Sequence, residues 1–160
     1  MSSFQIRIAS DELTFSASHF MIFEDGQCER LHGHTYRVST EVSGPLNAGG
    51  YVVDFLAVHE ALKSILADLD HRTLLPMQHA ALRVTCRGDV AEASLADRCW
   101  TFPADDCQLL PVANTTTELL AQHVGRCLLT SLTALGVDSI ERLRVTIDEG
   151  DGFSAICELR

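Results

Sequence analysis

Residues 28–43 of the sequence read CERLHGHTYRVSTEVS, and the second half of this stretch carries the clearest strand pattern in the chain. From residue 35 onward, apolar and polar side chains alternate, so that Tyr36, Val38 and Val42 share one face of an extended chain. Such alternation is typical of strands in antiparallel sheets that bury one face and expose the other. The sequence therefore predicts a strand over residues 35–43.

Segments on both sides of this strand supply further elements. Residues 4–8 alternate well enough for a strand, residues 44–50 form a turn rich in glycine, and residues 51–53 resume as a strand. Asp54 stands where a helix N-cap is expected, and the apolar residues after it keep helical spacing to about Leu69. At the end of the chain, residues 143–147 and 153–159 are expected to form two paired strands joined by a turn at 150–152.

A second helix is predicted to open at residues 115–118, Thr-Thr-Thr-Glu, which have the form of a capping box. Its buried stripe is expected at Leu120, Val124, Cys127, Leu128 and Leu135. The order of strands, two helices and strands indicates an α+β fold, in which both helices cover one face of an antiparallel sheet. Between the helices, residues 81–86 and 98–102 could form a hairpin around residues 88–97.

The bulk composition narrows the functional classes. The chain has 160 residues, enough for one domain with its own core, and a formal net charge of −10 with a pI near 5.0. A surface with that charge repels nucleic acid and anionic lipid, so neither is an expected partner. The sequence shows no apolar run long enough to cross a bilayer and no secretory signal, so we expect a cytoplasmic protein with six reduced cysteines.

Three histidines are candidate metal ligands. His32 and His34 lie two residues apart, so both imidazoles would point to the same face of a strand, and His19 lies on a segment that can pair alongside. Three neutral imidazoles leave one tetrahedral position open, as in catalytic rather than structural zinc sites. A His-x-His pair also arises by chance or as two polar residues on the surface. The spacing alone therefore leaves open whether these histidines bind a metal.

Cys28 precedes His32 by four residues, and its thiol has three possible roles. It could be a fourth ligand, which would close the site and make the zinc structural. It could instead lie beside the metal, where positive charge lowers the pKa of the thiol and favours the thiolate. The third interpretation is a buried, inert cysteine.

Two other places in the sequence carry acid–base groups. Asp70 and His71 follow the first predicted helix and could relay protons to a cysteine, although a histidine there could also simply complement the helix dipole. Glu149 continues the apolar face of the strand at 143–147, so its carboxylate would point inward and would suit a ligand with two adjacent N–H donors. The strand could equally end before Glu149 and leave it solvated.

Together these pieces resemble one family, the 6-pyruvoyl-tetrahydropterin synthase and 6-carboxy-tetrahydropterin synthase group. The matching stretches follow the family's order and cover most of the chain outside residues 76–111. They are FSASH at 15–19, CxxxHGH at 28–34, VDF at 53–55, LDH at 69–71, TTE at 116–118 and IDE at 147–149.

The resemblance implies the T-fold, or tunnelling fold, with four antiparallel strands and two helices on one face. The chain would be a single domain over residues 1–160, with an insertion at about 76–111 that is atypical of the family. It would assemble as a homohexamer, a dimer of trimers, with active sites between subunits.

The resemblance also implies roles for individual residues. The zinc ligands would be His19, His32 and His34. The catalytic acid–base groups would be Cys28, Asp70 and His71. The substrate-binding residues would be the pterin anchor Glu149, with Thr116 and Thr117.

The implied reaction is that of a zinc-dependent carbon–oxygen lyase. It converts 7,8-dihydroneopterin triphosphate to 6-carboxy-5,6,7,8-tetrahydropterin, with release of triphosphate and acetaldehyde, on the route to queuosine. The short gap between Cys28 and His32 is similar to that of the bacterial 6-carboxy branch. The alternatives are a 6-pyruvoyl-tetrahydropterin synthase, another zinc-dependent reaction on a related pterin if the insertion reshapes the pocket, and a non-catalytic pterin-binding module.

Overall fold

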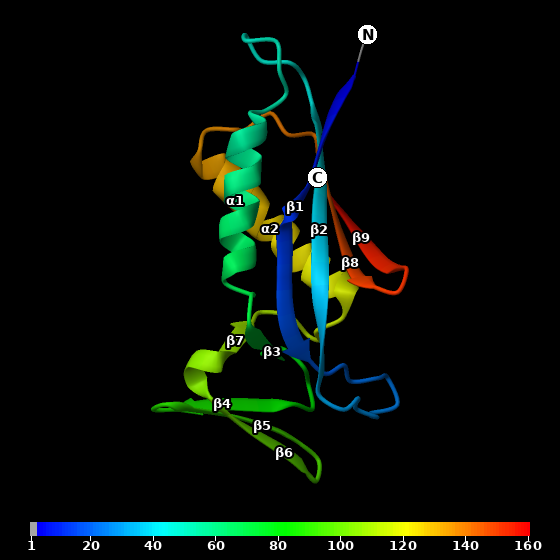
Figure 1. Cartoon of the computed structure of the whole chain (residues 1–160), viewed down its shortest axis with the longest axis vertical. Coiled ribbons are helices and arrows are strands. Elements are labelled where there is room, and N and C mark those ends of the chain that lie inside the picture. The colour runs from blue at the N-terminus through cyan, green and yellow to red at the C-terminus, as the bar shows by residue number, and fades with distance from the viewer. Residues whose placement is uncertain (1–2) are drawn as a thin grey trace.

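The computed structural model describes residues 3–160, which form a long twisted main sheet, a small second sheet at one end, and two helices (Figure 1). The main sheet contains β1 (Phe4–His19), β2 (His32–Gly44), β3 (Arg72–Pro76), β7 (Cys107–Leu110), β8 (Arg142–Gly150) and β9 (Phe153–Leu159). The small sheet contains β4 (Arg83–Arg87), β5 (Val90–Leu95) and β6 (Arg98–Pro103), and a 3-10 turn, η1 (Ala104–Asp106), leads from it to β7. The helices are α1 (Phe55–Ala67) and α2 (Thr117–Ala134), and neither of these described helices is long and apolar enough to cross a membrane.

The main sheet has the strand order β7-β3-β1-β2-β8-β9. Its strands β1, β2, β8 and β9 pair in the antiparallel sense, and the helices cover one face of them, so the predicted α+β class is confirmed (Figure 1). Two short strands, β3 and β7, extend the sheet beside β1 in the parallel sense. They were not predicted, because Leu74 and Leu75 in β3 are both buried and therefore leave no period-two alternation.

The core lies between the main sheet and the two helices, and the alternating residues of the opening stretch contribute to it as expected. Tyr36, Val38 and Val42 are buried on the helix-facing side of β2. The helices contribute Val58, Leu62 and Leu66 from α1 and Leu120, Ala121, Val124, Leu128 and Leu132 from α2. Strand β1 is longer than predicted, because an irregularity between Ala9 and Thr14 shifts its register and interrupts the sequence pattern.

Both predicted helix starts are confirmed, although Thr116 caps the second helix and the hydroxyl of Thr115 donates to the carbonyl of Phe20 instead of forming a capping box with Glu118. The carboxylate of Asp54 accepts a hydrogen bond from the backbone N–H of Leu56, and the hydroxyl of Thr116 accepts one from the N–H of Leu119. The first helix ends at Ala67, two residues before the predicted end, and the chain continues into a turn in which the backbone N–H groups of Leu69 and Asp70 both donate to the carbonyl of Leu66.

The prediction of a strand at residues 51–53 is wrong. Val52 and Val53 are buried in the core, but the chain there bends instead of pairing. The backbone of Tyr51 bonds locally instead, since its carbonyl accepts from the backbone N–H of Asn47 and its N–H donates to the Asn47 side chain. The apolar pair therefore reflects burial rather than extension into a sheet.

The predicted hairpin between the helices is also wrong in its pairing. Residues 88–97 are not its turn but contain β5, which lies between β4 and β6 in a three-stranded meander. Ala91, Ala93 and Leu95 of β5 are buried, and the turns fall at Gly88 and Ala96, both with positive φ. Two small alanines make the alternation of β5 easy to overlook.

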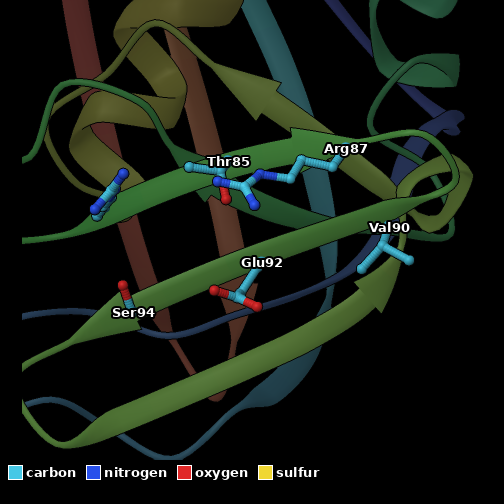
Figure 2. A pocket seen from close by; sticks show the side chains of 6 residues that line it. Thr85, Arg87, Val90, Glu92 and Ser94 are labelled. Atoms are coloured by element: carbon cyan, nitrogen blue, oxygen red, sulfur yellow. The ribbon is translucent and has the colours of Figure 1, made fainter.

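One face of the meander is turned outward. Figure 2 shows Thr85 and Arg87 of β4 beside Val90, Glu92 and Ser94 of β5 on this face, around a shallow pocket of about 190 Å³. The opposite face carries a second, smaller core, which contains Phe20, Ile22, Leu75, Leu82, Ala93 and Leu95. Cys28, Trp100 and Phe102 pack against this second core. The meander is thus attached to the segment that follows β1.

We expect Leu128→Ala to lower the free energy of unfolding by about 2–5 kcal/mol, because Leu128 is fully buried between α2 and the sheet. Leu135 at the end of the same helix is the matched control. It was predicted to lie in the buried stripe but is 62% exposed, because it is the C-cap residue where the chain leaves the helix. Chemical denaturation of both variants would contradict this packing if Leu135→Ala were as destabilising as Leu128→Ala.

Candidate metal centre and active site

Three histidines meet where β1 ends and β2 begins, at the end of the sheet nearest the meander (Figure 1). His19 is the last residue of β1 and pairs directly with His32, the first residue of β2. His34 lies two residues further along β2 and shares the helix-facing side with His32. One ligand nitrogen from each ring lies within 4.8 Å of the others. The structure therefore brings together the three predicted metal ligands.

The surroundings of these imidazoles fit a metal site. His19 donates from Nδ1 to the carbonyl oxygen of Thr115 at 2.8 Å, and His32 donates from Nδ1 to the carbonyl of Arg30 at 2.8 Å. Each bond leaves Nε2 free to act as a ligand, as is usual for metal-binding histidines. Within residues 3–160, Nε2 of His19 is one of only two buried side-chain atoms that lack a hydrogen-bond partner. Burial lowers the pKa of His19, which favours the neutral ring that a metal requires.

A cavity of about 630 Å³ opens beside the three histidines. Besides these ligands, it is lined by Met21, Glu29, Thr116, Thr117, Glu118, Glu149, Asp151, Gly152, Phe153, Ser154 and Ala155. Its lining thus comes from the end of β1, the start of β2 and the segment between them, from the start of α2, and from the end of β8, the start of β9 and the turn between them. The predicted substrate-binding residues Glu149, Thr116 and Thr117 all line this cavity.

Glu149 lies within β8, which continues to Gly150, so the interpretation of a solvated residue beyond the strand end does not apply. The hydroxyl of Thr117 donates to Oε2 of Glu149 at 2.6 Å, which fixes the carboxylate in the cavity. Tyr36 lies beneath the imidazoles, 5.5 Å from His34 between ring centroids. Burial first, and then the nearby carboxylate of Glu149, raises the pKa of the Tyr36 hydroxyl.

Cys28 and its neighbour Glu29 lie on different sides of the chain. The thiol of Cys28 packs against the second core and donates to the carbonyl of Glu29 at 3.3 Å, and burial raises its pKa. The carboxylate of Glu29 instead lines the cavity, where Oε2 accepts from the backbone N–H of Met21 at 3.0 Å and lies 3.9 Å from Nε2 of His32. Sequence reasoning missed Glu29, although its place three residues before His32 was a usable signal.

Asp70 and His71 lie in a different part of the surface. Nδ1 of His71 and Oδ2 of Asp70 are 2.8 Å apart, and His71 is 82% exposed with a φ of 58°. Asp70 also accepts a hydrogen bond from the backbone N–H of Ser16 at 2.7 Å, and this bond is the main reason why its pKa is lowered. His71 lines a second cavity, of about 570 Å³, with the outward-facing Ser16 and Ser18. Asp70 and His71 are therefore in contact with each other, but neither lines the cavity that contains Glu149.

The sequence model for 6-pyruvoyl tetrahydropterin synthase matches residues 8–159, which is nearly the whole chain. The chain belongs to this family. A protein of Methanocaldococcus jannaschii described as a 6-carboxy-5,6,7,8-tetrahydropterin synthase is 32% identical over 145 residues, which are 89% of this chain and 88% of that protein. The dihydroneopterin monophosphate aldolase of Pyrococcus furiosus is 38% identical over 61 residues, which are 38% of this chain and 51% of that protein.

Solved structures agree with the family assignment. The 6-pyruvoyl tetrahydropterin synthase of Plasmodium vivax superposes with a TM-score of 0.90 at 27% identity, and the alignment covers 99% of both chains. A second structure of the P. vivax enzyme, with the same TM-score and coverage at 26% identity, carries a glutamate-to-alanine change described as a catalytic residue mutant. The predicted family, the T-fold and the prediction of a lyase of the tetrahydropterin synthase type are therefore confirmed.

Proposed function

We propose that this protein is a zinc-dependent lyase that cleaves the side chain of 7,8-dihydroneopterin triphosphate. One observation carries the proposal: His19, His32 and His34 share a cavity with the carboxylates of Glu29 and Glu149. Three neutral imidazoles suit zinc and leave one coordination position for a substrate. Zinc held there would act as a Lewis acid on the hydroxyl groups of the substrate side chain.

Glu149 is the proposed anchor for the pterin ring. A 2-amino-pyrimidinone edge presents two adjacent N–H donors, and a carboxylate can accept both at once. The hydrogen bond from Thr117 holds the carboxylate of Glu149 in place before the substrate arrives. The side chain of the pterin would then extend toward the histidines, which line the same cavity.

Glu29 is the proposed general base and acid. Its carboxylate lies 3.9 Å from Nε2 of His32 and lines the same cavity as the three histidines, so it could exchange a proton with a substrate bound there. The description of a glutamate as a catalytic residue in the P. vivax enzyme supports this role. Cys28, the acid–base group predicted from the sequence, remains the alternative, but its thiol would have to turn out of the second core to act.

The proposed product is 6-carboxy-5,6,7,8-tetrahydropterin, formed with water and released with triphosphate and acetaldehyde. The name of the M. jannaschii relative supports this outcome. The reaction is redox-neutral, because the oxidation of the side chain balances the reduction of the ring. We place it in the cytoplasm, on the route to queuosine.

A second candidate is favoured by the position of Glu29. A carboxylate that removes the proton from the C2′ hydroxyl would let the C1′–C2′ bond break, and C1′ would then gain a proton. The products would be 6-hydroxymethyl-7,8-dihydropterin and a phosphorylated two-carbon aldehyde. The partial match to the P. furiosus aldolase supports this alternative.

The proposal includes assembly as a homohexamer of two trimers with active sites between subunits. Asp70 and His71 support it, since they form an exposed acid–base pair that does not line the cavity of Glu149. A neighbouring subunit could bring its own pair to this cavity, where the pair would supply a second proton-transfer group.

Mass spectrometry of the products distinguishes these reactions. Zinc-loaded protein incubated with 7,8-dihydroneopterin triphosphate should yield 6-carboxy-tetrahydropterin and acetaldehyde under the first proposal. A hydroxymethyl-dihydropterin and a phosphorylated aldehyde would establish the second candidate instead. Retention of zinc and tight binding of the pterin without any consumption would refute both and identify a non-catalytic binding module.

A further inference from the structure

We propose that the meander formed by β4, β5 and β6 is a positioning device for the active site, and that Arg98 is the residue through which it acts. Nη1 of Arg98 donates to the carbonyl oxygens of Cys28 at 2.8 Å and of Glu29 at 3.2 Å. At these two residues the backbone turns so that the side chain of Glu29 faces the cavity and that of Cys28 faces the second core. The inference rests on the proposed function, because it gives Glu29 a catalytic role.

Arg98 is itself held in place by aromatic side chains. Its guanidinium lies over the ring of Trp100, 4.7 Å from the centroid, in a cation–π contact. Trp100 stacks on Phe20 with 4.4 Å between centroids and an interplanar angle of 10°. Phe20 is fully buried and directly follows the ligand His19. The same pair of meander residues therefore contacts the chain next to both His19 and Glu29.

In the segment between β1 and β2, residues 23–27 make few contacts with distant parts of the chain. Residues 23–27 are exposed, and a single bridge pairs Ile22 with Cys28. Glu29 is tied to Met21 in two ways, since its backbone N–H donates to the Met21 carbonyl and its carboxylate accepts from the Met21 N–H. The contact of Arg98 with Cys28 and Glu29 spans about seventy residues of sequence and connects this turn to a separate sheet.

The orientation of the meander explains why Arg98 can reach this turn. Arg98 pairs with Leu95 and Trp100 pairs with Ala93, so both share the face of the meander that packs on the second core. Arg87 belongs to the opposite, outward face (Figure 2). Without Arg98, the carbonyls of Cys28 and Glu29 lose their shared donor, and the turn can rotate the Glu29 carboxylate away from the imidazoles. A displacement of about 1 Å at a catalytic group can cost about 100-fold in rate.

The test replaces Arg98 with methionine, which removes the donors but keeps an aliphatic stem over Trp100. We expect kcat for the dihydroneopterin substrate to fall by about 10-fold to 100-fold, with KM and zinc content unchanged. Amide hydrogen exchange at Met21 and Glu29 should become faster, whereas exchange in β5 should stay as in the wild type. Arg98→Lys, which keeps one donor group, should restore part of kcat. Arg87→Ala on the outward face is the control and should match the wild type in every measurement.

The proposal is overturned if Arg98→Met leaves kcat unchanged, or if kcat falls while exchange at Met21 and Glu29 stays slow. Loss of protection throughout β5 would show that the Arg98→Met substitution unfolds the meander. In that case, kcat and the amide exchange at Met21 and Glu29 would be compared in Arg98→Lys to test the proposal. A wild-type protein without turnover would refute the proposed function. In that case, the exchange comparison alone would decide whether Arg98 holds the turn.

Discussion

Glu29→Gln should lower kcat for 7,8-dihydroneopterin triphosphate by about 100-fold to 10,000-fold, because an amide cannot accept and return the proton that general acid–base catalysis requires. Glutamine keeps the size of the side chain and can still accept the hydrogen bond from the N–H of Met21, so the local structure should persist. Zinc content, measured by atomic absorption, should stay at one ion per chain, since the three histidines are unchanged.

Cys28→Ala is the matched comparison for this variant. Its thiol packs on the second core, so its removal should lower stability slightly and leave most of the turnover intact. The reverse result, in which Cys28→Ala loses turnover and Glu29→Gln keeps it, would identify the thiol of Cys28 as the acid–base group. Loss of zinc from Cys28→Ala would show that the cysteine is a ligand.

His19→Ala should abolish both zinc binding and turnover. His19 is the most enclosed of the three ligands, and its Nδ1 bond to Thr115 fixes the ring so that Nε2 faces the other two imidazoles. Two remaining histidines cannot hold zinc in the three-ligand arrangement of catalytic sites. The measurements are zinc content after dialysis and the rate of product formation.

His123→Ala is the control for this change. His123 lies on α2, outside the cavity of the three histidines, and contacts Cys127 at 3.8 Å. This variant should bind zinc and turn over substrate as the wild type does. Stoichiometric zinc in His19→Ala would mean that the metal site lies elsewhere.

Much of this architecture could be predicted from local patterns. Asp54 and Thr116 cap helices with their own side chains, and the strand over residues 35–43 shows its buried face through alternation alone. The three histidines could also be predicted, because a period of two places His32 and His34 on one face and an antiparallel partner brings in His19.

The parts that could not be predicted depend on distant contacts. Whether Cys28 or Glu29 faces the cavity is decided by the bridge to Ile22, the contact with Arg98 and the second core, and no local pattern reports these. The same holds for Val52 and Val53, whose apolar character reflects burial under the helices rather than membership of a strand. Parallel strands such as β3 likewise gain their place from partners elsewhere in the chain.

Zinc dependence is tested most directly by the turnover of 7,8-dihydroneopterin triphosphate by metal-free protein during stepwise addition of zinc. We expect no product without metal, and then a rise in pterin product and released triphosphate that reaches its plateau at one zinc per chain. Equal turnover by the metal-free protein, or no turnover at one bound zinc per chain, would contradict this expectation.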